Sequence, residues 1–158
     1  MDVVIDSSVL VGLLVPNDLW HTQAVALWEA IKAAGHVGLY FDCVAAESIS
    51  VAARRLHEKG LSTEVEALLD RLNDQVTSDA ITWILPDVPR LYPEVLTLIR
   101  SSSGALNFND ALIALACRER GIAAIASFDN DFDEVPWLQR LAYPEDAAPS
   151  HETGKPKD

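Results

Sequence analysis

The sequence predicts an α/β fold: a three-layer α/β/α sandwich around a central, mostly parallel sheet of four or five strands. Short apolar segments that suit strands alternate with longer segments whose apolar residues recur at helical spacing, which is typical of βαβ units. The strand segments are short and apolar, as expected for strands that helices cover on both faces.

The N-terminal half opens with a predicted strand over Asp2–Asp6, in which three β-branched residues are followed by a carboxylate. A short amphipathic helix follows and ends before Pro16, because proline cannot continue a helix. Four further elements follow, and Gly35 and Gly60 end two of the helices among them. They are a helix over Leu19–Ala34, a strand over Val37–Phe41, a helix over Val44–Lys59 and a helix from Ser62 to about Asp74.

The C-terminal half continues the alternation and ends in a polar segment. Its expected elements are a strand over Ala80–Leu85, a helix over Val88–Ser101, a helix from Asn107 to a stop at Gly121, a strand over Ile122–Ala126 and a weak strand near Leu141. Residues 144–158 lack large aliphatic side chains, so we expect a disordered tail behind a single folded domain over residues 1–143.

The chain is acidic, with 24 Asp and Glu against 12 Lys and Arg and a formal net charge of −12. This balance argues against tight nonspecific binding of nucleic acid, but it permits an enzyme that holds a phosphate backbone through metal ions. It also suits a basic protein partner. No apolar run reaches the roughly 18 residues of a membrane span, and the N-terminus lacks a signal-peptide pattern, so we expect a cytoplasmic protein.

Metal binding through sulfur or imidazole is not indicated. Cys43 and Cys117 form no C-x-x-C motif, and we expect each to be a small buried hydrophobic residue. The four histidines are scattered, and none pairs with a cysteine at ligand spacing, which disfavours zinc.

Four carboxylates are expected at one rim of the sheet: Asp6, Glu47, Asp110 and Asp129. Two follow predicted strands and two lie in the first turns of predicted helices, and in a parallel sheet strand ends and helix starts share a rim. Four close carboxylates cannot all stay ionised without a cation, and oxygen ligands suit Mg²⁺ or Mn²⁺. This pattern predicts metal-assisted phosphodiester hydrolysis, by one ion or by two that share the task.

Each acid also has an ordinary structural explanation when it is considered alone. Asp6 could cap the first helix, and Asp110 could be a first-turn acid that the helix dipole favours. Asp129 and Asp131 stand in a turn, where acids are common. Glu47 is harder to explain in this way, because an acid among apolar residues is costly unless it is satisfied. The joint placement of the four acids favours a functional site.

Four segments around these acids resemble the motifs of PIN domains: Val4–Ser8 (VIDSS), Ala46–Ile49 (AESI), Asn107–Leu112 (NFNDAL) and Ser127–Phe132 (SFDNDF). Their order, spacing and helix–strand context match over roughly residues 2–143. The segments around Asp110 and Asp129 are the more specific ones. In the last segment Asp129 is preferred as the fourth site acid, with Asp131 as the alternative and as a further candidate metal ligand.

The resemblance implies roles for the individual residues. Asp6 and Asp110 would be the direct ligands of Mg²⁺, with Mn²⁺ as a substitute. Glu47 and Asp129 would complete the acidic pocket, position or activate the attacking water, and serve as further candidate metal ligands. The Ser8 hydroxyl would help to hold Asp6 or a metal-bound water.

Within the PIN family, the chain resembles the VapC-like toxins of type II (VapBC) toxin–antitoxin pairs. This implies a Mg²⁺-dependent endoribonuclease with an RNA substrate, usually a homodimer. It also implies a cognate antitoxin that holds the toxin inactive by laying a basic or apolar segment across the site. The excess of acidic residues fits a basic inhibitory segment.

Two other functions compete with this interpretation. A catalytically silent PIN-like binding module would be favoured by the loss of a site acid, but all four acids are present. A phosphotransfer domain of the haloacid-dehalogenase or receiver type would also have an Asp after the first strand. The first type wants a second Asp where Ser8 stands, and a receiver wants an acidic pair where Val4 and Ile5 stand, so both are disfavoured.

Several residues outside these motifs admit a functional and a structural interpretation. His21 could be catalytic, although a capping or surface role is favoured. Four tryptophans could stack on RNA bases, although core or interface packing is favoured: Trp20, Trp28, Trp83 and Trp137. Four arginines could contact phosphates, although a solvated helix face is favoured: Arg54, Arg55, Arg118 and Arg120.

Overall fold

The chain builds one five-stranded sheet in the order β3-β2-β1-β4-β5, and the computed structural model describes residues 1–148. Every neighbouring pair of strands is parallel. The strands are β1 (Asp2–Ile5), β2 (Val37–Phe41), β3 (Ile81–Thr82), β4 (Ala124–Ala126) and β5 (Gln139–Leu141). The side chains from Val3 to Ile5 are fully buried, because β1 lies at the centre of the sheet with helices over both faces.

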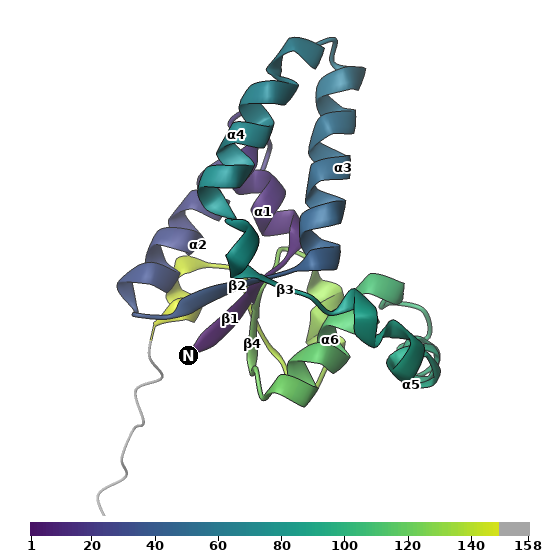
Figure 1. The fold of residues 1–158 in the computed structure, drawn as a ribbon. Helices are drawn as coiled ribbons and strands as arrows, with labels where there is room; N and C mark the ends of the chain where they lie inside the picture. Colours follow the sequence, from purple (N-terminus) through teal and green to yellow (C-terminus); the bar gives the residue numbers. More distant parts are fainter. Residues whose placement is uncertain (149–158) are drawn as a thin grey trace, which may run out of the picture.

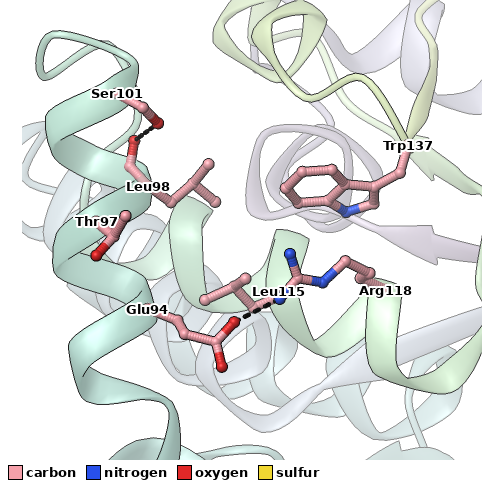
Figure 2. Close-up of a pocket in the computed structure, with 7 residues that line it drawn as sticks. All are labelled: Glu94, Thr97, Leu98, Ser101, Leu115, Arg118 and Trp137. Carbon is pink, nitrogen blue, oxygen red and sulfur yellow. Dashed lines mark hydrogen bonds and ion pairs between the residues drawn. The ribbon is translucent and has the colours of Figure 1, made fainter.

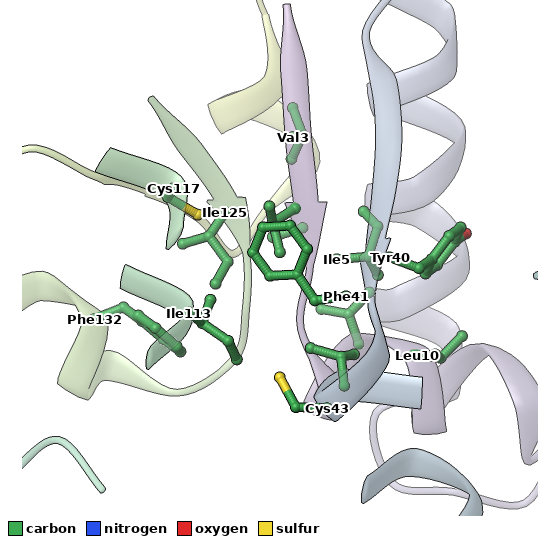
Figure 3. Packing of buried hydrophobic residues seen from close by; sticks show 14 of the residues in the cluster. Val3, Ile5, Leu10, Tyr40, Phe41, Cys43, Ile113, Cys117, Ile125 and Phe132 are labelled. Carbon is green, nitrogen blue, oxygen red and sulfur yellow. The ribbon is translucent and has the colours of Figure 1, made fainter. Parts of the chain in front are cut away.

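Helices cover the sheet on both sides and complete the predicted three-layer α/β/α fold, which is therefore confirmed (Figure 1). The α-helices are α1 (Ser7–Leu14), α2 (His21–Ala33), α3 (Asp42–Glu58), α4 (Val65–Gln75), α5 (Val88–Ser101) and α6 (Phe108–Arg120). Figure 3 shows Leu10 of α1 on one side of the sheet, and Ile113 and Cys117 of α6 on the other. Within residues 1–148, no helix combines the length and the apolar character needed to cross a membrane.

Short 3-10 helices connect several of these elements. They are η1 (Ser62–Glu64), η2 (Ser78–Ala80), η3 (Leu85–Asp87), η4 (Asn130–Glu134) and η5 (Pro144–Ala147). The long helices α3 and α4 lie side by side and rise beyond the sheet (Figure 1). β1 and β4 end, and α3 and α6 begin, at one rim of the sheet.

The strand expected over Ala80–Leu85 is much shorter in the structure, where only Ile81–Thr82 pair with β2. The reason is a buried carboxylate that competes for the backbone. The N–H groups of Ile84 and Leu85 donate to the carboxylate of Asp42 at 3.0 and 3.1 Å, so these two residues leave the line of the strand.

The first residues of the expected disordered tail are folded. Pro144–Ala147 form η5, and the side chain of Ala147 is buried. The carboxylate of Asp146 accepts a hydrogen bond from the N–H of Ala142 at 2.8 Å, which fixes this turn to the end of β5. The folded domain therefore extends past residue 143, and residues 149–158 of the expected tail lie outside the described part of the chain.

Three residues expected to pack in the interior do so. Cys43 and Cys117 are both buried free thiols, and burial raises the pKa of each to about 12. Trp28 packs against the core beside Gly38. A Cβ atom at Gly38 would lie 2.5 Å from the Trp28 ring, so only glycine allows this close approach of α2 to β2.

Candidate active site

The four predicted acids meet at the rim where β1 and β4 end and α3 and α6 begin. Asp6 follows β1 directly, and Asp129 follows β4 after two residues. Asp110 lies in the first turn of α6 and Glu47 in the second turn of α3. The four acids are also close enough for their charges to affect one another. Beyond the effect of burial, the charges of the other three acids raise the pKa of Asp110. We call these four residues the carboxylate rim.

Asp6 is buried and held through one of its two oxygens. Its Oδ2 atom accepts hydrogen bonds from the Ser8 hydroxyl at 2.7 Å and from the Ser127 hydroxyl at 2.8 Å. The N–H of Ser8 also donates to Oδ2 at 3.3 Å, so Asp6 caps α1 while it faces the rim. The structural and functional interpretations of Asp6 are therefore compatible.

Ser127 is a residue that the sequence analysis missed. Its buried hydroxyl donates to Asp6 and accepts the N–H of Asp129 at 3.0 Å, while the Ser8 hydroxyl accepts the N–H of Phe128 at 3.0 Å. The two serines thus connect the end of β1 to the loop after β4. The position of Ser127, at the end of a buried strand and two residues before a candidate ligand, is the signal that could have identified it.

Asp110 combines a helix cap with a place on the rim. Its Oδ2 atom accepts the N–H of Asn107 at 3.0 Å, and its own N–H donates to the Asn107 amide oxygen at 3.1 Å, which makes a capping box at the start of α6. Burial raises the pKa of Asp110 to about 6, against the lowering effect of the Asn107 hydrogen bond. The charges of Asp6, Asp129 and Glu47 act in the same direction as burial.

Glu47 shows a similar perturbation. Burial and then the charge of Asp6 raise the pKa of Glu47, while the polar side chains of Ser7 and Asn109 lower it. The sequence analysis expected an acid in this apolar stretch to be costly, and the raised pKa is the physical form of that cost.

The two candidates for the fourth acid differ in their surroundings. Asp129 raises the pKa of Asp110, whereas Asp131 is not among the groups that perturb it. Asp131 instead donates its backbone N–H to Oδ1 of Asp129 at 2.9 Å. This geometry supports Asp129 as the fourth member of the rim, with Asp131 as part of the turn that positions it.

The chemistry of the rim fits a divalent cation. Each of Asp6, Asp110 and Asp129 uses one carboxylate oxygen for a hydrogen bond, and the other oxygen has no such partner within residues 1–148. None of the ion pairs in that range involves a rim acid. The rim therefore carries negative charge that protein cations do not balance, which is the condition that a bound metal ion relieves.

The rim does not form a closed cage for such an ion. Among the described residues, no three Asp, Glu, His or Cys side chains already stand close enough together to enclose one. One or two carboxylates would then hold the ion, and water and phosphate oxygens would complete its shell. This is the coordination that Mg²⁺ prefers.

Asp42 is a second residue that the sequence analysis missed. It stands at the start of α3, is buried, and accepts hydrogen bonds from the N–H groups of Cys43, Ile84 and Leu85. These contacts fix the beginning of the helix that carries Glu47, and α3 accordingly starts two residues before the expected Val44. An Asp between a strand and a helix is the pattern that could have indicated this role.

All four arginines considered as phosphate contacts form ion pairs, and Arg55 pairs with Asp18. Arg54 lies 3.9 Å from Glu58, and Arg120 lies 2.9 Å from Asp87. Arg118 pairs with Glu94 at 2.5 Å and lies over the Trp137 ring at 5.0 Å. Figure 2 shows this arrangement beside a cavity of about 220 Å³ between α5 and α6, which contains no rim acid.

The contacts of His21 support the structural interpretation of that residue. Its Nδ1 atom lies 2.8 Å from the carbonyl oxygen of Gly12, which ties the start of α2 to α1. Trp137 likewise donates its indole N–H to the Ala114 carbonyl at 3.0 Å, as expected for a packing residue.

Comparison with known proteins gives a family for the chain. The PIN domain family matches residues 3–138. The fold is similar to the crystal structure of Mycobacterium tuberculosis VapC20, described as a sarcin-ricin loop cleaving toxin, with a TM-score of 0.64 and 20% sequence identity over 87% of this chain and 97% of that one. A search of curated proteins found no match. The family expected from the four motifs is confirmed: this chain belongs to the PIN domain family.

Proposed function

We propose that this protein is a Mg²⁺-dependent endoribonuclease that acts in the cytoplasm as the toxin of a toxin–antitoxin pair, with its active site at the carboxylate rim. The observation that carries the proposal is the rim itself. Four acids from four elements meet there, their charges and burial raise the pKa of Asp110, and no cation of the described residues is paired with them. Membership of the PIN family and the fold similarity to an RNA-cleaving toxin support this function.

The proposal gives each rim residue a task. Asp6 and Asp110 would hold the ion through the oxygens that their hydrogen bonds leave available. Ser8 and Ser127 keep Asp6 in place, and Ser127 also holds the backbone of Asp129. When bound, Mg²⁺ or Mn²⁺ would supply positive charge for the phosphate and lower the pKa of a water ligand.

Glu47 is the proposed acceptor for the proton of the attacking water. Its pKa is raised by burial and by Asp6, so it is a better base than an exposed carboxylate. Ser7 and Asn109 oppose the rise in pKa and stabilise the charged form that the task requires.

The proposed partners follow from the same charge distribution. An antitoxin with a basic segment would find an unbalanced negative site at the rim, and such a segment would exclude both metal ion and RNA. The chain is further proposed to act as a homodimer, as small PIN toxins commonly do. Light scattering of the purified chain would test the dimer separately from the catalytic proposal.

The direct test of function is cleavage of a pool of structured RNAs by the purified, partner-free protein, with Mg²⁺ or Mn²⁺ and with EDTA. Asp110→Asn should lower the rate by about a hundredfold or more, because it removes a proposed metal ligand. Asp70→Asn, at an exposed Asp of α4, is the matched control and should cleave at the unchanged rate.

Two outcomes would contradict the proposal. Absence of cleavage in every metal condition would favour a silent PIN-like binding module. Cleavage that survives both EDTA and Asp110→Asn would place the chemistry at another site or in a contaminant. The phosphotransfer alternative is set aside because the chain is a PIN domain.

A further inference from the structure

A groove leads away from the carboxylate rim, between α3 and the turn that precedes α2. Its inner part is a cavity of about 240 Å³ lined by Ser8 and Glu47 of the site and by Trp20 and Arg55. Its outer part is a cavity of about 340 Å³ that shares Trp20 and Arg55 and is also lined by Lys59. The two cavities share Asp18, Trp20 and Arg55 and therefore adjoin each other, and we call them together the groove.

Trp20 presents an open aromatic face in this groove. Its ring stacks on Phe128, with ring centres 5.0 Å apart and planes inclined by 22°, and Phe128 directly precedes the rim acid Asp129. An aromatic ring has two faces, and Phe128 covers one of them. The residue is nevertheless 42% exposed and lines both cavities, so it offers accessible surface that Phe128 does not cover.

The opposite wall of the groove carries cations. Glu47, Val51 and Arg55 recur every four residues and therefore lie along one side of α3. Lys59 follows directly after the end of this helix and lines the outer cavity. Arg55 is about 12 Å along the helix axis from Glu47, from the rise of an α-helix. Lys59 forms no ion pair among the described residues, unlike most of the basic side chains there.

Asp18 fixes both walls relative to each other. Its carboxylate accepts the N–H of Trp20 at 2.9 Å and a hydrogen bond from Nη1 of Arg55, and its side chain is only 7% exposed. The Arg55 side chain is 44% exposed and has five N–H donors, so donors remain for a second anion. The contacts of Asp18 therefore fix the positions of Trp20 and Arg55 and leave both residues accessible.

We propose that this groove is a binding subsite for single-stranded RNA next to the bond that is cut. One base stacks on the open face of Trp20, and Arg55 and Lys59 contact the neighbouring phosphates. A groove that combines an aromatic platform with cations along one wall is typical of sites that hold single strands. The inference rests on the proposed function, since it assigns the substrate of the same site.

The test measures RNA binding by fluorescence anisotropy in the Asp110→Asn background, which is not expected to cleave. The probes are a labelled single-stranded RNA octamer of random sequence and an octamer of the same backbone without bases. With Trp20 present, we expect the RNA without bases to bind about tenfold more weakly, since stacking is the contact that it loses.

Substitutions at Trp20 show whether this loss belongs to the proposed platform. Trp20→Leu keeps an apolar side chain against Phe128 but has no aromatic face, so it should bind both probes with the same weakened affinity. Trp20→Phe should retain most of the difference between the two probes. Trp83→Leu, at a tryptophan that is 63% exposed and lines neither part of the groove, should behave as the parent.

A separate measurement tests the cationic wall. Lys59→Gln should reduce the slope of log affinity against log salt by about one, as for the loss of one phosphate contact. An unchanged slope would remove Lys59 from the subsite.

An equal penalty for the missing bases in the parent protein and in Trp20→Leu would overturn the stacking subsite and leave the groove to a protein partner. If Trp20→Leu fails to fold, the two probes are compared on the protein with Trp20 intact, where equal affinities would overturn the subsite. Failure of the proposed function is distinguishable, because RNA cleavage by the unaltered protein is measured separately. Cleavage without Trp20-dependent base binding would overturn only the subsite.

Discussion

Acidic residues behave in opposite ways in two regions of this molecule. At the carboxylate rim they face one another, and the pKa values of Asp110 and Glu47 are raised. Across α5 and α6, acids face arginines, and hydrogen bonds from Arg120 and Arg90 lower the pKa values of Asp87 and Glu119. We call this second group the ion-paired face, and it comprises Asp87, Arg90, Glu94, Arg118, Glu119 and Arg120.

The difference separates acids whose charge is balanced by a nearby arginine from acids whose charge is left unbalanced. An acid paired with an arginine at the surface gains little and costs little. A buried acid among other acids is unfavourable in the empty protein and becomes favourable when a cation binds. We therefore infer that the unfavourable charge at the carboxylate rim serves the proposed metal site.

The loop after β4 contains both kinds of acid and gives the largest expected effect. Asp129→Asn should lower metal-dependent RNA cleavage by about a hundredfold, because it removes a rim acid. Asp133→Asn, at an acid that pairs with Arg140 at 2.8 Å, should change the rate by less than about twofold. Asp131→Asn should resemble Asp133→Asn, since only the backbone of Asp131 contacts Asp129. A larger loss at Asp131 than at Asp129 would reverse their assignment.

The next effect concerns the hydroxyl that joins the two sides of the rim. Ser127→Ala leaves Asp6 with one hydroxyl donor fewer and the Asp129 N–H without its acceptor. We expect cleavage to fall by about tenfold and the free energy of unfolding by about 1–3 kcal/mol. Ser101→Ala, at an exposed serine of α5 whose hydroxyl donates to the Leu98 carbonyl, is the control for loss of a hydroxyl and should leave cleavage unchanged. Cleavage rates and denaturant midpoints together distinguish a positioning role from simple destabilisation.

Stability against pH should differ between wild type and Asp110→Asn in the absence of metal. Folded Asp110, with a pKa of about 6, binds its proton more tightly than the unfolded residue, with a pKa of 3.8, so this group's contribution to stability falls as pH rises through that window. Asp110→Asn removes this loss and should be more stable than wild type at pH 8 by about 1–2 kcal/mol, after allowance for solvent screening. At pH 4 the difference should be much smaller. Melting temperatures of the two proteins between pH 4 and pH 8 measure this difference in stability. Equal melting temperatures at pH 8 would contradict the raised pKa of Asp110.

The smallest effect is expected on the ion-paired face. Arg90→Ala removes contacts to Glu119 and Asp87, which are exposed to solvent and salt. We expect the melting temperature to change by less than about 2 °C and RNA cleavage to be unchanged. A large loss of activity in this variant would show that the ion-paired face takes part in substrate or partner binding.

The positions of the rim acids could be predicted from the sequence because these acids lie next to strands and helices that the sequence predicts. Asp6 and Asp129 follow apolar strands, and Asp110 begins a helix with a recognisable capping sequence. A parallel sheet then brings these ends together, so the position of each acid could be derived without knowledge of side-chain contacts.

Contacts between distant side chains and backbone groups could not be derived in this way. Asp42 draws the N–H groups of Ile84 and Leu85 out of the predicted strand, although about forty residues separate them along the chain. Ser127 contacts Asp6 from the end of the neighbouring strand, and Trp20 stacks on Phe128 from a turn with no distinctive sequence pattern. The spacing of apolar residues indicates which face of a helix or strand is buried, but it does not indicate with which group a polar side chain forms a hydrogen bond.

The most direct test of the central claim is a calorimetric titration of Mn²⁺ into the metal-free protein at neutral pH. Wild type, Asp110→Asn and Glu119→Gln are compared, so that one acid of the rim and one acid of the ion-paired face are each neutralised. We predict that wild type and Glu119→Gln bind the ion with equal affinity and that Asp110→Asn binds it at least about tenfold more weakly. Equal binding by all three proteins, or no binding by wild type, would contradict the assignment of the carboxylate rim as a metal site.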